Sequence, residues 1–169
     1  MILLFADEHD RTEKEITGIL FGCGANIVAG NRVAGRGGFT VAVMREPVAV
    51  GSCRGAAVFG GGSADFAGQR LPDSVTGICE EGDLPALTVF QNSGVPVITC
   101  GMDQRNTVTL SSLTETSALV ALQRSLQDNF GREITPGEFK IALCRRYSPF
   151  AIMASAAALL TEGMRPERF

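Results

Sequence analysis

The first residues that could do chemistry form a glycine-rich loop, "FGGGSAD", in the middle of the chain. The loop follows an apolar run that is typical of a buried strand, and loops at the carboxyl ends of strands line the crevice of open α/β sheets. Free backbone amides in such a loop can hold an anion. The alternative interpretation of the loop is a plain turn without a ligand. No GK[ST] follows, so the loop is not a phosphate-cradling P-loop. Its candidate ligand-binding residues are Gly60, Gly61, Gly62, Ser63 and Asp65.

Acidic residues directly after an expected strand at 75–79 form a second candidate site. Glu80, Glu81 and Asp83 could serve as a general acid and base or hold a cation, because carboxylate oxygens ligate hard cations. The alternative is a group of solvated acids before a helix that Asp83 caps. We keep all three residues as candidate ligand contacts.

A third acidic group, Asp7, Glu8, His9 and Asp10, lies near the N-terminus. These residue types could form a metal site. The start of a helix explains them better, because acidic side chains are stabilised at the positive end of the helix dipole. We therefore predict no metal site here, and we assign no catalytic residue and no cofactor to the chain.

The cysteines are odd in number, widely spread and without a CxxC pair, and the chain has a single histidine. A zinc site needs clustered ligands, so none is expected, and the thiols should be buried and act as small hydrophobes. Cys53 lies beside Arg54, which could lower its pKa and make it a nucleophile. A loop cysteine without a chemical role is the favoured alternative. The cysteines are Cys23, Cys53, Cys79, Cys100 and Cys144.

A polar bend lies between two extended runs in "ITCGMDQRNTVTLSS", residues 98–112. Asp103, Arg105 and Asn106 in this bend could line a ligand pocket. The bend could also serve folding alone, and we favour that structural interpretation.

The elements that must position these residues alternate between strands and helices. An apolar strand at residues 1–6 precedes a helix that ends near Gly22, and a second strand follows at 25–30. Asp10 and Glu13 fit a capping box at the start of that helix. This strand–helix–strand order is the usual unit of a parallel sheet.

Further strands are expected at 39–44 and 55–59, after a loop rich in Gly and Arg at 30–38. Residues 74–100 repeat the strand–helix–strand unit, with a helix from Asp83 to Gly94. Residues 116–127 fit either a helix or alternating strands, whereas 137–143 alternate clearly. A last helix begins at Ser148 and ends at Gly163.

The last helix is apolar almost all round, so it should be buried deeply or at an interface. We expect a monomer of 17.8 kDa to leave part of such a helix uncovered, and we therefore predict a homo-oligomer. The whole chain, 1–169, is expected to form one α/β domain with a mainly parallel, Rossmann-like sheet.

The composition excludes several classes of protein. Hydrophobic residues make up 45%, the net charge is −3 and no dense Lys/Arg tract exists, which argues against disorder and against nucleic acid as a partner. No apolar run reaches the roughly 20 residues that span a bilayer. The N-terminal residues also lack the pattern of a signal peptide, so no membrane association and a cytoplasmic location are expected.

From about residue 55 to 165, the sequence resembles the later part of the central domain of the Mur ligases. The matching stretches are "PDSVTGICEEGDLPALTVFQNSGVPVITCGM" and "RRYSPFAIMASAAALLTEGM". The stretch between them, through "GREITPGEFKIAL", is similar to a hairpin region of that family. The resemblance implies strands rather than a helix at 116–127, and thus an antiparallel hairpin near the C-terminus.

The departures from the Mur ligase pattern concern ATP. The GTNGKT-type phosphate loop has no counterpart, and Tyr147 and Ser148 stand where the family has His and Asn, with Ala151 at a second Asn. Without these parts the phosphates and Mg²⁺ lack their anchors. The resemblance therefore implies a non-catalytic scaffold that binds a small ligand or a protein partner, without ATP-dependent ligase activity. The alternative is an enzyme of unknown reaction that uses loops 53–65 and 79–83.

Overall fold

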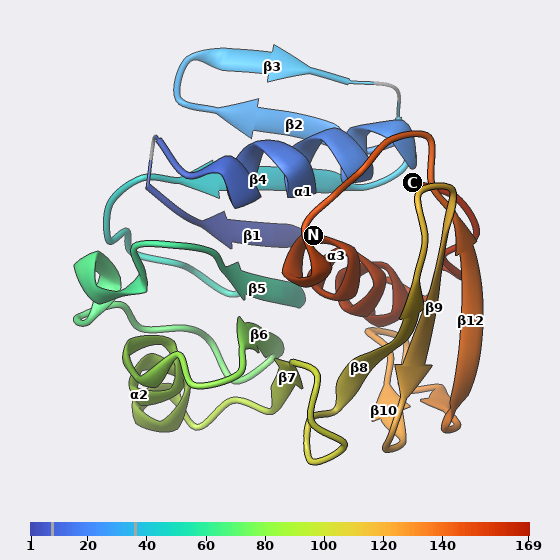
Figure 1. The fold of residues 1–169 in the computed structure, drawn as a ribbon. Coiled ribbons are helices and arrows are strands. Elements are labelled where there is room, and N and C mark those ends of the chain that lie inside the picture. Colours follow the sequence, from blue (N-terminus) through green and yellow to red (C-terminus); the bar gives the residue numbers. More distant parts are fainter. Residues whose placement is uncertain (8, 36) are drawn as a thin grey trace.

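The structure is a computed structural model that describes residues 1–7, 9–35 and 37–169. Glu8, a member of the acidic group at 7–10, and Arg36, within the loop at 30–38, lie outside the described residues. Figure 1 shows a large curved sheet with helices against both of its faces. The predicted α/β fold with a mainly parallel sheet is confirmed.

The described residues form a ten-stranded sheet in the order β12-β9-β8-β7-β6-β5-β1-β4-β2-β3. Neighbouring strands from β2 to β8 in this order are parallel. At the edges, β3 is antiparallel to β2, and β9 is antiparallel to both β8 and β12. The strands are β1 (Ile2–Phe5), β2 (Asn26–Ala29), β3 (Arg32–Ala34), β4 (Thr40–Met44), β5 (Gly55–Phe59), β6 (Val75–Glu80), β7 (Val97–Cys100), β8 (Val108–Leu113), β9 (Ser117–Leu122) and β12 (Gly137–Ala142). A separate small sheet contains β10 (Leu126–Gln127) and β11 (Glu133–Ile134).

Helices α1 (Arg11–Gly22) and α3 (Pro149–Thr161) pack against each other on one face of the sheet. Helix α2 (Leu84–Ser93) and a 3₁₀ turn, η1 (Ser63–Phe66), contact each other and pack with the hydrophobic cluster on the other face. A strand between two such layers is buried on both sides, which explains why β1 is the continuous apolar run "ILLF".

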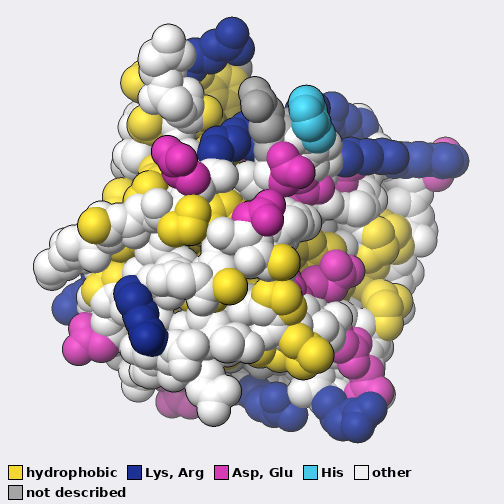
Figure 2. Space-filling model, turned by 90° about the vertical axis from the view of Figure 1, so that its left-hand side faces the viewer, with side chains coloured by type: hydrophobic (Ala, Val, Ile, Leu, Met, Phe, Trp, Pro, Cys, Tyr) yellow, Lys and Arg dark blue, Asp and Glu magenta, His cyan; other side chains and the backbone are white. Residues whose placement is uncertain are grey.

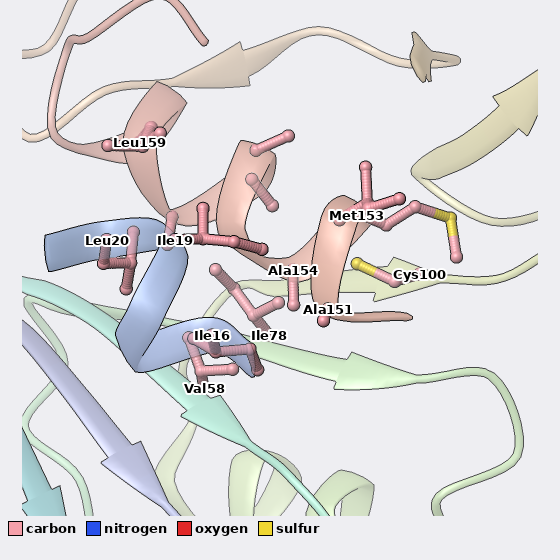
Figure 3. Close-up of a cluster of buried hydrophobic side chains, with 14 of the residues drawn as sticks. Ile16, Ile19, Leu20, Val58, Ile78, Cys100, Ala151, Met153, Ala154 and Leu159 are labelled. Atoms are coloured by element: carbon pink, nitrogen blue, oxygen red, sulfur yellow. The ribbon is translucent and has the colours of Figure 1, made fainter. Parts of the chain in front are cut away.

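Helix α3 is buried from Phe150 to Thr161, because α1, the parallel strands and the curled β8–β9–β12 segment surround it. Figure 3 shows Ala151, Met153 and Ala154 of α3 among side chains from α1 and the sheet. Small side chains let this helix approach the sheet closely. The monomer therefore covers the apolar helix on which the prediction of self-association rested.

The ambiguous segment at 116–127 forms strands, as predicted, because β9 pairs with both β8 and β12. One local prediction was wrong: the Gly- and Arg-rich segment at 30–38 contains β3, which pairs antiparallel with β2. The residues Arg32–Ala34 are all exposed, so no apolar pattern marks them as a strand. Pairing with β2 provides the hydrogen bonds that select the extended form.

All three predicted caps are present. Asp10 accepts a hydrogen bond from Thr12 N (2.9 Å), Asp83 from Ala86 N (3.1 Å), and Ser148 from Ala151 N (3.3 Å). The capping box was only half right.

Glu13 does not return a bond to Asp10 N, because its carboxylate contacts Arg45 (3.0 Å) and Asp10 N donates to Asp7 O (3.1 Å).

No helix of the described residues is long and apolar enough to cross a membrane.

Candidate functional site at the carboxyl ends of the strands

Two adjoining hollows of about 310 and 530 Å³ lie at the carboxyl ends of β5, β6 and β7. Both are lined by Thr12, Glu80, Glu81 and Phe150, so we treat them as one carboxyl-end cleft. The loops that follow these strands and the N-termini of α1, α2 and α3 form its walls. This edge is the usual place for ligands in open α/β sheets. The other lining residues are Phe59, Gly60, Gly61, Gly62, Ser63, Gly82, Asp83, Gly101, Met102, Ser148, Pro149 and Met153.

The charged side chains that line this cleft are all acidic. They are Glu80, Glu81 and Asp83, and no Lys or Arg joins them among the described residues. Burial and the nearby Asp83 raise the pKa of Glu80 above its ordinary value. Figure 2 views the side on which β1, β4 and β5 end, where acidic side chains lie among several Lys and Arg side chains. The cleft therefore favours cations and opposes phosphates.

The glycine loop is closed by Asp10, which lies 51 residues away in sequence. Asp10 Oδ2 accepts the N–H of Gly61 (2.8 Å), while Oδ1 accepts the N–H of Thr12 in the first turn of α1. A Cβ atom on Gly60 would lie 2.8 Å from Asp10 Oδ2, so the close approach requires glycine there. The Gly61 amide that the sequence offered to an anion is thus occupied by a carboxylate of the chain itself.

The β1–α1 connection is the strand–loop–helix unit in which a phosphate loop would lie. Its sequence, "ADEHD", contains neither glycine nor lysine. Asp10 caps the helix at the position where a helix N-terminus would otherwise attract phosphate. The anion-binding end of α1 is therefore satisfied internally.

The polar bend after β7 is held in place by Asn106, which is 5% exposed. Asn106 Nδ2 donates to Glu81 Oε2 (2.9 Å) and to Asp103 O (3.0 Å). Asp103 and Arg105 pair with each other at the exposed part of the bend (3.1 Å). Any Cβ on Gly101 would collide with Glu81 and Asn106, so glycine is needed at the end of β7. The contacts of Asn106 support a structural role for the bend.

The structure brings together most of the predicted site residues and separates the rest. Lining the cleft are Gly60, Gly61, Gly62, Ser63, Glu80, Glu81 and Asp83. Asp65, Asp103 and Arg105 are not among its lining residues, and Asn106 contacts it only through Glu81. Sequence reasoning missed Thr12, Ser148, Phe150 and Met153. The cap signals at Asp10 and Ser148 could have indicated helix N-termini at this edge.

Cys53 does not belong to this cleft. It precedes β5 at the amino edge of the sheet, whereas the glycine loop follows β5 at the carboxyl edge. Burial raises the pKa of Cys53, and the Arg54 guanidinium donates instead to Asn129 O (2.9 Å). The alternative enzyme site built from loops 53–65 and 79–83 is therefore wrong in placing Cys53 with the acids.

The prediction of buried thiols holds for two cysteines and is wrong for three. Cys79 and Cys100 are buried, Cys23 and Cys53 are half-buried, and Cys144 is exposed. Burial, followed by the nearby Asp83, raises the pKa of Cys79 to about 12. Within the described part of the chain, no three His, Cys, Asp or Glu residues are arranged to hold a metal ion.

Comparisons with solved structures show the fold alone. The crystal structure of UDP-N-acetylmuramate:L-alanyl-gamma-D-glutamyl-meso-diaminopimelate ligase from Neisseria meningitides aligns with 99% of this chain, at a TM-score of 0.60 and 13% sequence identity. The chain spans 62% of the length of that ligase chain. No protein-family model matches the sequence, and no curated protein matches it at a significant level. The fold is thus Mur-ligase-like.

Proposed function

We propose that this chain is a non-catalytic binding protein on a Mur-ligase-like fold, and that its carboxyl-end cleft takes a small cationic ligand such as an amine. The observation that carries this proposal is the charge of the cleft: Glu80, Glu81 and Asp83 line it without a cationic side chain among the described residues. Methylene and ring surfaces of Phe150 and Met153 provide the apolar wall that small-molecule sites commonly have.

Ligase activity is not proposed, although the structural neighbour is a ligase by its title. Phosphoryl transfer depends on amides, a lysine and Mg²⁺ around the phosphates. Here the β1–α1 loop has no lysine and Asp10 occupies the Gly61 amide. We expect ATP to bind with millimolar affinity at best, about −4 kcal/mol.

The residues at the family's His and Asn positions contribute to packing instead. The Arg145 guanidinium lies 4.9 Å from the centre of the Tyr147 ring. Ser148 caps α3 and donates its backbone N–H to Glu15 Oε2 (2.7 Å). The Ser148–Glu15 bond joins α3 to α1, and the Arg145–Tyr147 contact lies within the segment before α3. Both contacts support a structural role for these residues.

Isothermal titration tests the proposal with 1,4-diaminobutane as the cationic probe and with ATP–Mg²⁺ as the anionic one. We expect the diamine to bind and ATP to give no measurable heat at micromolar concentrations. Glu80→Gln should weaken diamine binding about five- to tenfold, because one charge-assisted contact is removed. Asp65→Asn, which removes a nearby acid outside the cleft lining, is the matched control.

The pH dependence adds a second readout. A cation binds the ionised form of Glu80, whose pKa is raised, so diamine affinity should increase as pH rises through that raised pKa and then level off. In Glu80→Gln this component should disappear. A low-micromolar dissociation constant for ATP, or diamine binding that Glu80→Gln leaves unchanged, would contradict the proposal.

An enzyme remains the second candidate because one observation favours it. A carboxyl with a raised pKa in a cleft is a common feature of general acids and bases, and Glu80 has both properties. Turnover of an amine substrate that is lost in Glu80→Gln would distinguish this candidate from simple binding.

A further inference from the structure

A second hollow, of about 610 Å³, lies at the opposite edge of the sheet. It is bounded by the amino ends of β6 and β7 and by residues 124–131, which run from the end of β9 into the β10–β11 hairpin. We propose that this amino-edge pocket binds a small organic carboxylate with a short apolar chain. The proposal is independent of the carboxyl-end cleft, with which the pocket shares no lining residue.

Two guanidinium groups supply the recognition of the carboxylate. Arg54 uses Nη1 to donate to Asn129 O, which fixes its side chain and leaves its remaining donors available. Arg124 lines the same pocket and has no hydrogen bond or ion pair within the described residues. A guanidinium presents parallel N–H donors that match the two oxygens of a carboxylate. Both arginines therefore remain able to bind an anion.

Apolar residues in the lining can bind the hydrocarbon chain of the proposed ligand. Val75 and Ile98 are buried, and Val97 and Leu126 are half-buried against the same hollow. A hydrocarbon chain in contact with the exposed parts of Val97 and Leu126 would be removed from water, which stabilises binding by about 25 cal/mol per Å² of apolar surface. The volume of the pocket is within the usual range for sites of small molecules, roughly 300–1,000 Å³.

The acids near the pocket do not cancel its positive charge. The carboxylate of Asp128 is already used, since Oδ2 accepts from Arg132 Nε (2.6 Å) and Oδ1 from the N–H groups of Phe130 and Arg132. Asp73 is exposed and is the one other acid that the described residues contribute to the lining. Two arginines and one unpaired carboxylate leave the pocket with a net charge of about +1, which favours a ligand with a single carboxylate.

The walls are fixed before any ligand arrives. Asn129 N donates to Thr161 O (2.8 Å) and its side-chain amide donates to Glu162 (3.0 Å), so the hairpin is tied to the end of α3. Ser74 Oγ donates to Cys53 O (2.6 Å), which joins the segments that precede β5 and β6. A preformed pocket loses little conformational entropy on binding.

The test is an NMR titration of the ¹⁵N-labelled full chain with hexanoate, and with hexanamide as the neutral molecule of the same shape. Hexanoate should shift the amide signals of Thr76, Leu126 and Gln127 in a saturable way, and hexanamide should bind about tenfold more weakly or not at all. Added NaCl should weaken hexanoate binding, because exposed charges are screened.

Arg124→Gln is the decisive variant, because Arg124 holds no other part of the structure in place. Binding of hexanoate should fall about five- to tenfold in this variant. Arg32→Gln, which removes the same charge from the exposed β3 strand, should bind as the wild type does. The proposal would be overturned if Arg124→Gln bound hexanoate as well as the wild type, or if hexanamide bound as well as hexanoate. It would also be overturned if hexanoate gave no shift at 50 mM, roughly the weakest useful affinity.

Discussion

Asp10 determines what the carboxyl-end cleft can bind. One of its oxygens holds the first turn of α1 and the other holds the glycine loop, so a single carboxylate fills the place where an anionic ligand would lie. The loop therefore has the glycine content of an anion-binding site, but its Gly61 amide is not free to bind an anion. Neighbouring acids, Glu80 above all, complete a surface suited to cations.

Removing this carboxylate should expose two amides at once. We expect Asp10→Ala to lower the free energy of unfolding by about 1–2 kcal/mol, as for other lost helix caps. Inorganic phosphate should restore part of this stability in the variant, because helix N-termini attract anions. Urea unfolding with and without phosphate measures both effects, and Asp65→Ala is the control. An Asp10→Ala variant as stable as the wild type would refute this role.

Glu15 links α1 to the start of α3 and should make stability depend on pH. Burial raises its pKa, but hydrogen bonds from Ser148 and Arg11 outweigh burial, and the net pKa is below its ordinary value of 4.5. A lowered pKa in the folded state stabilises the protein fully above 4.5, and this stabilisation is lost as pH falls through the lowered value.

Glu15→Gln should therefore be less stable than the wild type by about 1–3 kcal/mol at neutral pH, and the difference should shrink below pH 4.5. Urea unfolding at a series of pH values measures this. Glu46→Gln, at an exposed residue, should differ little from the wild type at any pH. A difference that stays constant down to low pH would show that the charge of Glu15 is not responsible.

At the scale of elements, the packing of α2 on the sheet depends on Gly77 in β6. A Cβ atom there would lie 2.6 Å from the ring of Phe90, which is fully buried and cannot move aside. Gly77→Ala should cost about 1–3 kcal/mol, as overpacking in cores commonly does. Gly68→Ala is the matched control, since nothing lies within 4 Å of its added methyl group. Equal urea midpoints for the two variants would contradict the expected clash.

At the scale of the whole molecule, self-association stays a prediction but needs a different surface, because α3 is covered within the monomer. The open edge of β3 is the candidate in the described part of the chain: its residues are exposed, Val33 by 75%, and edge strands pair readily with other strands. The other edge, β12, is bridged by the segment around Arg168 only at its last residue, Ala142.

Light scattering measures the mass directly. An antiparallel β3–β3 pair would give twice 17.8 kDa, and Val33→Lys should return the protein to a monomer by placing like charges across the pair. A mass of 17.8 kDa for the wild type at high concentration would rule out the dimer.

The sequence by itself determined the local elements. Caps at Asp10, Asp83 and Ser148, continuous apolar strands and alternating helices are signals between neighbouring residues, and they were sufficient for an α/β fold with a mainly parallel sheet. Even the loops that line the carboxyl-end cleft could be predicted, because the carboxyl ends of parallel strands meet at one edge.

Only the tertiary structure decided which of these residues meet. The Asp10–Gly61 bond joins residues 51 positions apart, β3 is a strand only through its pairing with β2, and Cys53 is separated from the glycine loop by the whole of β5. The Asp10–Gly61 bond depends on a long-range contact between segments that carry no mutual signal in the sequence. The β2–β3 pairing, by contrast, is a local hairpin across Gly30 and Asn31. Local propensity sets the elements, whereas burial and strand pairing across the sheet set their neighbours.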